Sequence, residues 1–273
     1  MTHPREGPMG RVRLADLALE VRDEGRGPPA LLLHGFPTTN RLWDGVIPAL
    51  RDAGLRCIAP DLAGYGLSES PGGEPGMERQ AGWLTELLDA LGVESALIVA
   101  HDVGSAAAQI LVATDPRRAR GLVVADGVYA GEWAMDGVES IQRWEPRNAA
   151  RLAPVLARKM RSPGLSEESI RAMLAPYQGE EGGLRLIRAA RALDPSQTAS
   201  RVEALRAAGV PALVLWGESD RYLPIDTIAR PLAQLLRAEL RVLPGGHFIP
   251  AETPLAFAAE VIRFAKSLPE RIP

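Results

Sequence analysis

The sequence is poor in several residue types, and each scarcity excludes a class of protein. The only cysteine among 273 residues, Cys57, allows no internal disulfide. No run approaches the roughly 20 apolar residues of a membrane span, and a net charge of −3 provides no broad basic face for nucleic acid. Four histidines and one cysteine are too few and too scattered for an ordinary metal site.

The absence of certain sequence patterns also bears on the location of the protein in the cell and on its need for a cofactor. Residues 1–11 contain charges and prolines but no apolar run, so we expect no signal peptide and, by default, a cytoplasmic protein. Gly64–Gly66 and Gly72–Gly73 lack the strand-to-helix setting of a nucleotide-binding loop, so we expect no cofactor. The apolar run Cys57–Pro60 predicts that the thiol is buried and structural.

Short apolar runs alternate with helical patterns, which is typical of a mostly parallel sheet wrapped by helices. The run Ala30–His34 ends before a glycine, as expected for a strand covered on both faces. Eight strands are predicted, over Val12–Leu14, Leu17–Val21, Ala30–His34, Arg56–Pro60, Ser95–Ala100, Leu122–Ala125, Ala212–Trp216 and Leu240–Leu243. Helices are predicted over Met77–Leu91, Ser105–Thr114, Asp226–Leu236 and Pro254–Ser267.

One segment, 127–205, breaks this alternation with helical, Arg/Ala-rich sequence that contains no strand-like run. We interpret it as a helical cap inserted after the sixth strand, between core segments 1–126 and 206–273. Ligands in open α/β sheets bind outside the carboxyl ends of the strands. The cap is therefore predicted to lie over those ends as a lid.

The chain from Ala100 to Gly104 has the pattern of a nucleophile elbow, a sharp strand-to-helix turn with small residues on either side of the nucleophile. The nucleophile position falls on Asp102. A carboxylate there stands at a helix N-terminus, where backbone N–H groups and the helix dipole favour an anion. The simpler alternative is that Asp102 only caps the helix. Ser105 is the alternative nucleophile, although it lies beyond the elbow.

The catalytic base is predicted by elimination among the four histidines. His3 lies near the terminus, His34 belongs to the loop after the third predicted strand, and His101 precedes the nucleophile. His247 stands in a glycine-flanked loop after the last strand and remains free to act as a base.

A histidine base needs an acid that orients it and stabilises the imidazolium. Asp220 follows the seventh strand, and the order Asp102, Asp220, His247 is that of the triad in this type of fold. Asp126, which ends the strand after the elbow helix, is the alternative acid.

The loop His34–Pro37 and the residue after the nucleophile are expected to supply the backbone N–H groups of an oxyanion hole, from Phe36 and Val103. Aromatic side chains of the cap are candidates to line the pocket or simply to pack the cap onto the core. The candidate substrate-binding residues are His34, His101, Tyr129, Trp133, Trp144, Tyr177 and Phe248.

Four motifs in order, His34–Pro37, Asp61–Ser68, His101–Gly104 and Gly246–His247, resemble the α/β-hydrolase superfamily over nearly the whole chain. The aspartate at the elbow resembles the branch of epoxide hydrolases and haloalkane or fluoroacetate dehalogenases. The resemblance implies an α/β-hydrolase fold in which the aspartate forms an alkyl-enzyme ester. The histidine would then activate water to hydrolyse that ester.

The chain departs from each subfamily of this branch. Val103 stands where both epoxide hydrolases and haloalkane dehalogenases usually have tryptophan, and Phe36 where the dehalogenases have asparagine. The arginines that follow the nucleophile in fluoroacetate dehalogenases are missing. Tyr129 and Tyr177 do not match the spacing of the two epoxide-activating tyrosines, and Gly183–Arg188 resembles the stretch bearing one of them without containing a tyrosine.

We therefore expect a hydrolase that acts through an aspartyl ester on a small, largely apolar molecule, as a monomer or homodimer. Epoxides are favoured because Phe36-Pro37, Asp220 and a proton-donating tyrosine such as Tyr177 fit that subfamily. The alternatives are a haloalkane or haloacid dehalogenase with the same triad, a Ser105-dependent esterase, and a non-catalytic ligand-binding protein.

Overall fold

The computed structural model of the chain describes residues 9–269, so His3 and most of the N-terminal segment 1–11, for which no signal peptide is expected, lie outside the described residues. The chain forms an eight-stranded sheet in the order β1-β2-β4-β3-β5-β6-β7-β8. Only β2 runs against the others, so its pairings with β1 and β4 are antiparallel and all other pairings are parallel, which confirms the predicted mostly parallel sheet. The strands are β1 Met9–Arg13, β2 Ala18–Glu24, β3 Pro29–Leu33, β4 Arg56–Pro60, β5 Ala96–Asp102, β6 Ala119–Gly127, β7 Ala212–Gly217 and β8 Glu239–Leu243.

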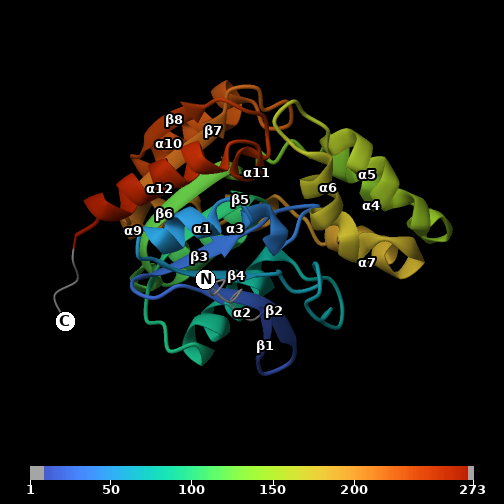
Figure 1. The fold of residues 1–273 in the computed structure, drawn as a ribbon, viewed down its shortest axis with the longest axis horizontal. Helices are drawn as coiled ribbons and strands as arrows, with labels where there is room; N and C mark the ends of the chain where they lie inside the picture. The colour runs from blue at the N-terminus through green and yellow to red at the C-terminus, as the bar shows by residue number, and fades with distance from the viewer. Residues whose placement is uncertain (1–8, 270–273) are drawn as a thin grey trace, which may run out of the picture.

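Helices cover both faces of the sheet (Figure 1), as the continuous apolar runs of its central strands require. On one face α1 packs against α12, and on the other α3 packs against α2 and α9, with α10 beside α9. These helices are α1 Ile47–Asp52, α2 Met77–Ala90, α3 Gly104–Thr114, α9 Val202–Ala208, α10 Arg230–Leu236, α11 Ile249–Glu252 and α12 Pro254–Ser267.

The helix predicted over Asp226–Leu236 is interrupted. A π-helical turn occupies Ile225–Ala229, and α10 begins at Arg230. Pro231 explains the change, because it has no N–H to continue an α-helical ladder and is tolerated in the first turn of a new helix.

Between β6 and β7 the chain is mainly helical. Four helices, α4 Asp136–Gln142, α5 Leu152–Met160, α6 Glu167–Leu174 and α7 Gly179–Arg191, form a layer beside the carboxyl ends of the strands (Figure 1). We call α4–α7 the helical layer. The short helix α8 Ser196–Ala199 and α9 pack instead against α3. The boundary predicted at residue 205 therefore falls inside a helix that covers the sheet.

Buried polar contacts join the helical layer to the loops of the sheet. The Tyr177 hydroxyl donates to the Thr38 carbonyl at 3.0 Å and accepts the Gly66 N–H at 2.9 Å. Arg185 of α7 donates to the Ser68 carbonyl at 2.6 Å. Each hydrogen bond satisfies a backbone group that has little access to water. Loss of these bonds should therefore weaken the attachment of the helical layer to the sheet.

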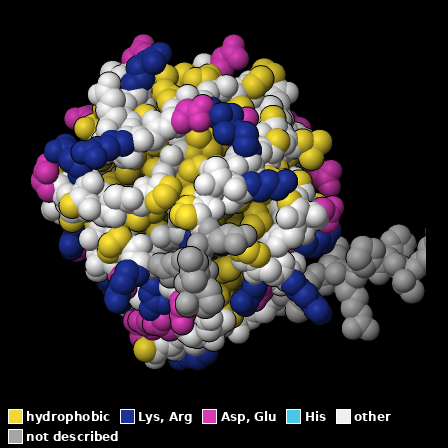
Figure 2. All heavy atoms as spheres, turned by 90° about the vertical axis from the view of Figure 1, so that its left-hand side faces the viewer, with side chains coloured by type: hydrophobic (Ala, Val, Ile, Leu, Met, Phe, Trp, Pro, Cys, Tyr) yellow, Lys and Arg dark blue, Asp and Glu magenta, His cyan; other side chains and the backbone are white. Residues whose placement is uncertain are grey.

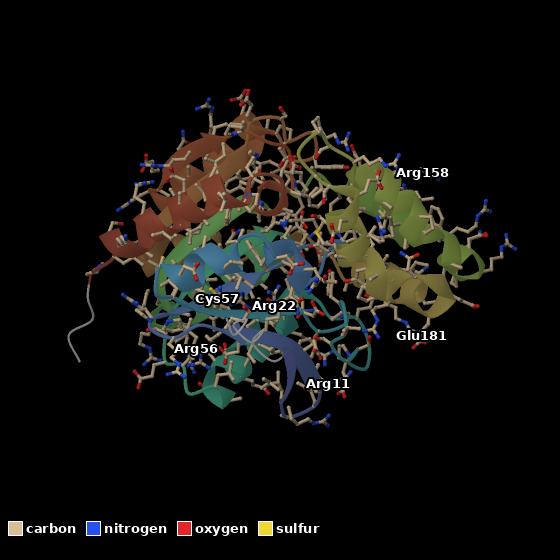
Figure 3. All side chains as sticks on the ribbon, viewed as in Figure 1. Arg11, Arg22, Arg56, Cys57, Arg158 and Glu181 are labelled. Atoms are coloured by element: carbon tan, nitrogen blue, oxygen red, sulfur yellow. The ribbon has the colours of Figure 1, made fainter. Side chains whose placement is uncertain are left out.

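The single cysteine is buried, and the surface carries charges of both signs. Cys57 lies within β4 (Figure 3) and is buried, and burial raises the pKa of its thiol to about 12, so it is unreactive. Arg158 and Glu181 are exposed on the helical layer. Basic and acidic side chains are interspersed over the face seen in Figure 2. No helix within residues 9–269 is long and apolar enough to cross a bilayer.

Replacing Tyr177 with Phe should lower the free energy of unfolding by about 1–3 kcal/mol, because it leaves the buried Gly66 N–H without its partner. Tyr129→Phe is the matched control, since its hydroxyl has no hydrogen-bond partner among the described residues. Urea unfolding of both variants measures the difference. Equal stability of the two would contradict the anchoring role of Tyr177.

Candidate active site

The predicted elbow is a turn between the central strand β5 and α3. Asp102 ends β5 with φ at +51°, and α3 begins two residues later at Gly104. Such a backbone conformation costs a residue with a side chain about 1–2 kcal/mol. A Cβ atom on residue 104 would lie 2.2 Å from the His34 carbonyl oxygen. Glycine there allows the loop after β3 to approach the elbow.

The structure brings Asp102, His247 and Asp220 together from the ends of three strands. His247 follows β8, and its Nε2 atom lies 3.5 Å from Oδ2 of Asp102. Its Nδ1 atom lies 3.0 Å from Oδ2 of Asp220. The side chains are 5%, 13% and 0% exposed for His247, Asp102 and Asp220. The imidazole therefore bridges two largely desolvated carboxylates.

The two carboxylate oxygens of Asp102 face different partners. Oδ1 accepts the backbone N–H of Phe36 at 2.7 Å. The backbone N–H of Val103 also acts on the carboxylate and contributes to lowering its pKa. Oδ2 is the oxygen nearer to His247. Backbone groups from two loops therefore act on this carboxylate.

The charges at the site stabilise each other. Burial alone would raise the pKa of Asp102, but the hydrogen bond and the charge of His247 hold it below its usual range. Burial alone would lower the pKa of His247, yet the charge of Asp220 and the contacts with both carboxylates raise it well above 6.5. These opposite shifts favour an ionised carboxylate beside a protonated imidazole.

Of the two predicted acids, Asp220 contacts the histidine. Its Oδ1 accepts the backbone N–H groups of Tyr222 and Leu223 at 2.8 and 3.0 Å, which leaves Oδ2 directed at His247. This turn after β7 positions the carboxylate.

Asp126 has a different environment from the one expected of a triad acid. It lies inside β6 with φ at +40°, and its Oδ1 accepts the Gly217 N–H at 2.7 Å. Its Oδ2 is buried without a hydrogen-bond partner. Burial first, and then the charge of Asp220, raise the pKa of Asp126 well above its usual range. Because Asp126 makes no hydrogen bond to His247, it does not orient the imidazole.

Ser105, the alternative nucleophile, is buried and already hydrogen-bonded. Its Oγ donates to the Asp102 carbonyl at 2.6 Å and accepts the Val128 N–H at 3.0 Å. The hydroxyl stabilises the elbow and does not line the cavity described next. This geometry corrects the expectation of a Ser105 nucleophile.

A largely apolar cavity opens above Asp102, between the sheet and the helical layer. Its empty space, part of it open to solvent, is about 790 Å³. Side chains of α4 and α5 form its outer wall. The lining residues are Phe36, Pro37, Asp102, Val103, Trp133, Ala134, Met135, Gly137, Val138, Ile141, Leu156, Lys159, Met160, Tyr222, Leu223, His247 and Phe248.

Two of the predicted substrate-binding residues, His34 and His101, are fully buried behind this cavity. His34 Nε2 accepts the Leu62 N–H at 3.0 Å, and His101 Nε2 lies 2.7 Å from the His247 carbonyl oxygen. Burial lowers the pKa of each to about 4, so both are neutral. They support the loops instead of contacting substrate, which corrects the prediction.

The aromatic candidates divide into two groups. Trp133 and Phe248 line the cavity. Tyr129, Trp144 and Tyr177 do not. Trp144 donates its indole N–H to the Asn148 carbonyl, and the Tyr177 hydroxyl is committed to the anchoring contacts described above. The polar groups of Trp144 and Tyr177 are therefore hydrogen-bonded away from the cavity.

Sequence reasoning missed several residues of the site. Tyr222 and Lys159 line the cavity, although neither belongs to a motif. Glu252 of α11 accepts the backbone N–H groups of Gly246 and Phe248 and so holds the His247 loop from both sides. Its position six residues after Gly246, at the end of the short helix α11, was the only available signal.

Comparison with known proteins gives consistent matches. The profile of the alpha/beta hydrolase fold family matches residues 28–254. Haloalkane dehalogenase 2 of Mycobacterium tuberculosis is 30% identical over 254 residues, which cover 88% of this chain and 88% of that protein. The epoxide hydrolase of Caballeronia sordidicola is 26% identical over an alignment of 307 positions, which covers 92% of each chain.

A solved structure agrees with these relatives. The haloalkane dehalogenase DbeA of Bradyrhizobium elkani is similar with a TM-score of 0.79 at 27% identity, over 95% of this chain and 97% of that chain.

Proton NMR of the imidazole rings should show that His247 keeps its proton to a pH well above 6.5, because two carboxylates stabilise the imidazolium. Asp220→Asn removes one of these charges and should lower the midpoint. Asp52→Asn, an exposed carboxylate on α1, should leave it unchanged. A midpoint at or below 6.5 in the unaltered protein would refute this electrostatic description.

Proposed function

This chain belongs to the alpha/beta hydrolase family, in the branch of haloalkane dehalogenases and epoxide hydrolases, and from this membership we propose that it hydrolyses epoxides through an ester of Asp102. One observation carries the proposal. The Asp102 carboxylate lines an apolar cavity, with Oδ1 bonded to the Phe36 N–H and Oδ2 beside His247.

The first step is alkylation of the carboxylate. Oδ2 of Asp102 attacks an epoxide carbon, the C–O bond of the ring breaks, and its electron pair goes to the epoxide oxygen. The backbone N–H of Phe36 holds Oδ1, which leaves Oδ2 as the attacking oxygen. The mostly apolar walls reduce the competition of water with the substrate at the carboxylate.

The second step is hydrolysis of the ester. His247 Nε2 takes a proton from a water molecule, and the hydroxide attacks the carbonyl carbon of the Asp102 side chain. The negative charge then develops on Oδ1, where the Phe36 N–H already lies at 2.7 Å. Collapse of this intermediate releases the diol and restores the carboxylate.

The change in charge at Asp102 makes His247 available at the right time. In the resting enzyme the carboxylate raises the pKa of His247 and keeps the ring protonated. Ester formation removes that negative charge, so the pKa of His247 falls and the ring can release its proton and act as a base. Asp220 continues to orient the ring and stabilises the imidazolium that forms again during hydrolysis.

The indole groups support epoxides over halides as the substrate. A departing halide needs a hydrogen-bond donor, and Trp133 is the only tryptophan within residues 9–269 that lines the cavity. Its N–H donates to Thr198 Oγ1 at 2.9 Å. The epoxide oxygen stays attached to the product, so an epoxide needs a proton donor in the cavity and does not need a binding site for a departing halide.

Dehalogenation is the second candidate, because the 30% identical relative carries the name haloalkane dehalogenase. The same attack by Asp102 would release a halide, and hydrolysis of the ester would be identical. A serine esterase is disfavoured because the Ser105 hydroxyl is committed to backbone partners. A purely ligand-binding protein would not need an imidazole between two carboxylates.

The helical layer acts as the cap in this proposal. Val138 and Ile141 of α4 and Leu156 and Met160 of α5 contribute apolar surface to the cavity. We therefore propose small, largely apolar epoxides as substrates.

His247→Gln should trap the ester, because the carboxylate can still attack but no base activates water. Incubation with styrene oxide should add the mass of one substrate molecule to the peptide that contains Asp102. Asp102→Ala in the same background is the control and should show no adduct. Modification of Ser105, or no adduct with epoxides but one with bromoalkanes, would argue against the epoxide assignment.

The two acids should differ in their effect on turnover. Asp220→Asn should lower kcat by about 10²–10⁴-fold, because the amide no longer stabilises the imidazolium. Asp126→Asn should change kcat by less than about tenfold, because Asp126 does not contact His247 and an amide of the same shape can still accept the Gly217 N–H. Steady-state kinetics of the two variants measure both effects on kcat. A larger loss in Asp126→Asn than in Asp220→Asn would assign the role of the acid that orients His247 to Asp126.

A further inference from the structure

We infer that Lys159 donates the proton to the epoxide oxygen during alkylation of Asp102. This inference rests on the proposed function and adds a catalytic residue to it. The alkoxide released by ring opening is strongly basic, and in a largely apolar cavity it needs a nearby donor.

Elimination among the polar side chains of the cavity leaves Lys159. The Trp133 indole N–H is used by Thr198, and the two His247 nitrogens face Asp220 and Asp102. The other polar lining residues are Tyr222, considered next, and Lys159. No ion pair or hydrogen bond engages the Lys159 ammonium within residues 9–269.

Tyr222 is committed to the backbone of the same lysine. Its ring lies against His247, with 5.1 Å between ring centroids, and its hydroxyl donates to the Lys159 carbonyl at 2.8 Å. Arg221 donates to that carbonyl as well and to the Arg161 carbonyl at 3.0 Å. These contacts fix the end of α5 near the catalytic imidazole, with the Tyr222 ring between them. The four-carbon stem of Lys159 lets its ammonium extend from this fixed point.

A lysine in the last turn of a helix also has a simpler explanation, because its charge complements the helix dipole. The chain contains only one other lysine, Lys266, and it stands in the last turn of α12. Both lysines are exposed, but only Lys159 lines the cavity. Lys266 therefore serves as a matched control for the helix-end effect.

The atoms and charges of the step balance. Asp102 Oδ2 forms a bond to carbon, the ring C–O bond breaks, and the epoxide oxygen takes a proton from Lys159 Nζ to become a hydroxyl. Because Lys159 is exposed, its amine regains a proton from solvent. The water that later hydrolyses the ester supplies one proton to the second hydroxyl, and its other proton returns to solvent.

The test measures alkylation of Asp102 in the His247→Gln background, where the ester accumulates. Two reagents are compared by mass spectrometry: styrene oxide, whose oxygen needs a proton, and benzyl bromide, whose bromide does not. Lys159→Met should lower the ratio of the epoxide rate to the bromide rate by about 100-fold or more. Lys159→Arg keeps a cation, so its ratio should lie between those of the unaltered lysine and Lys159→Met. Lys266→Met should leave the ratio unchanged.

An unchanged ratio in Lys159→Met, or equal slowing with both reagents, overturns the role of Lys159 while leaving the ester mechanism standing. Failure of styrene oxide to label Asp102 when both lysines are intact overturns the proposed function itself, and this inference with it.

Discussion

The contact on which the site depends is the His247 ring held between the carboxylates of Asp102 and Asp220. Each of these groups is unfavourable alone in a desolvated site, because burial opposes its charge. Together they form a chain of opposite charges that tolerates burial. The requirement that three loops meet within hydrogen-bonding distance explains much of the surrounding structure. These loops follow β5, β7 and β8 of one parallel sheet.

The neighbouring backbone keeps these loops at fixed distances. Gly104 allows the loop after β3 to approach the elbow, and the strained φ of Asp102 persists because Ser105 ties its carbonyl. Glu252 and His101 hold the His247 loop through backbone groups. These supporting residues have polar atoms aimed at the main chain, so the cavity above them remains mostly apolar.

Much of the fold followed from local pattern. Apolar runs predicted the eight strands, and the missing run between β6 and β7 predicted the helical segment, because these signals depend on neighbouring residues. The elbow and the glycine-flanked histidine were also found locally. Local pattern did not reveal where the helical layer ends. The helices α8 and α9 follow it in sequence but pack against α3 on the sheet, and only these tertiary contacts show it.

The sequence by itself determined that a carboxylate stands at a strand-to-helix turn and that one histidine was available to face it. Tertiary structure alone decided that Asp220 and not Asp126 contacts this histidine, that Ser105 is committed to backbone, and that Tyr177 anchors the helical layer while Lys159 lines the cavity. The physical reason is that a motif specifies the local turn of the chain. Which polar tip meets which partner depends on distances between segments far apart in sequence, and each buried group takes the partner that packing brings within reach.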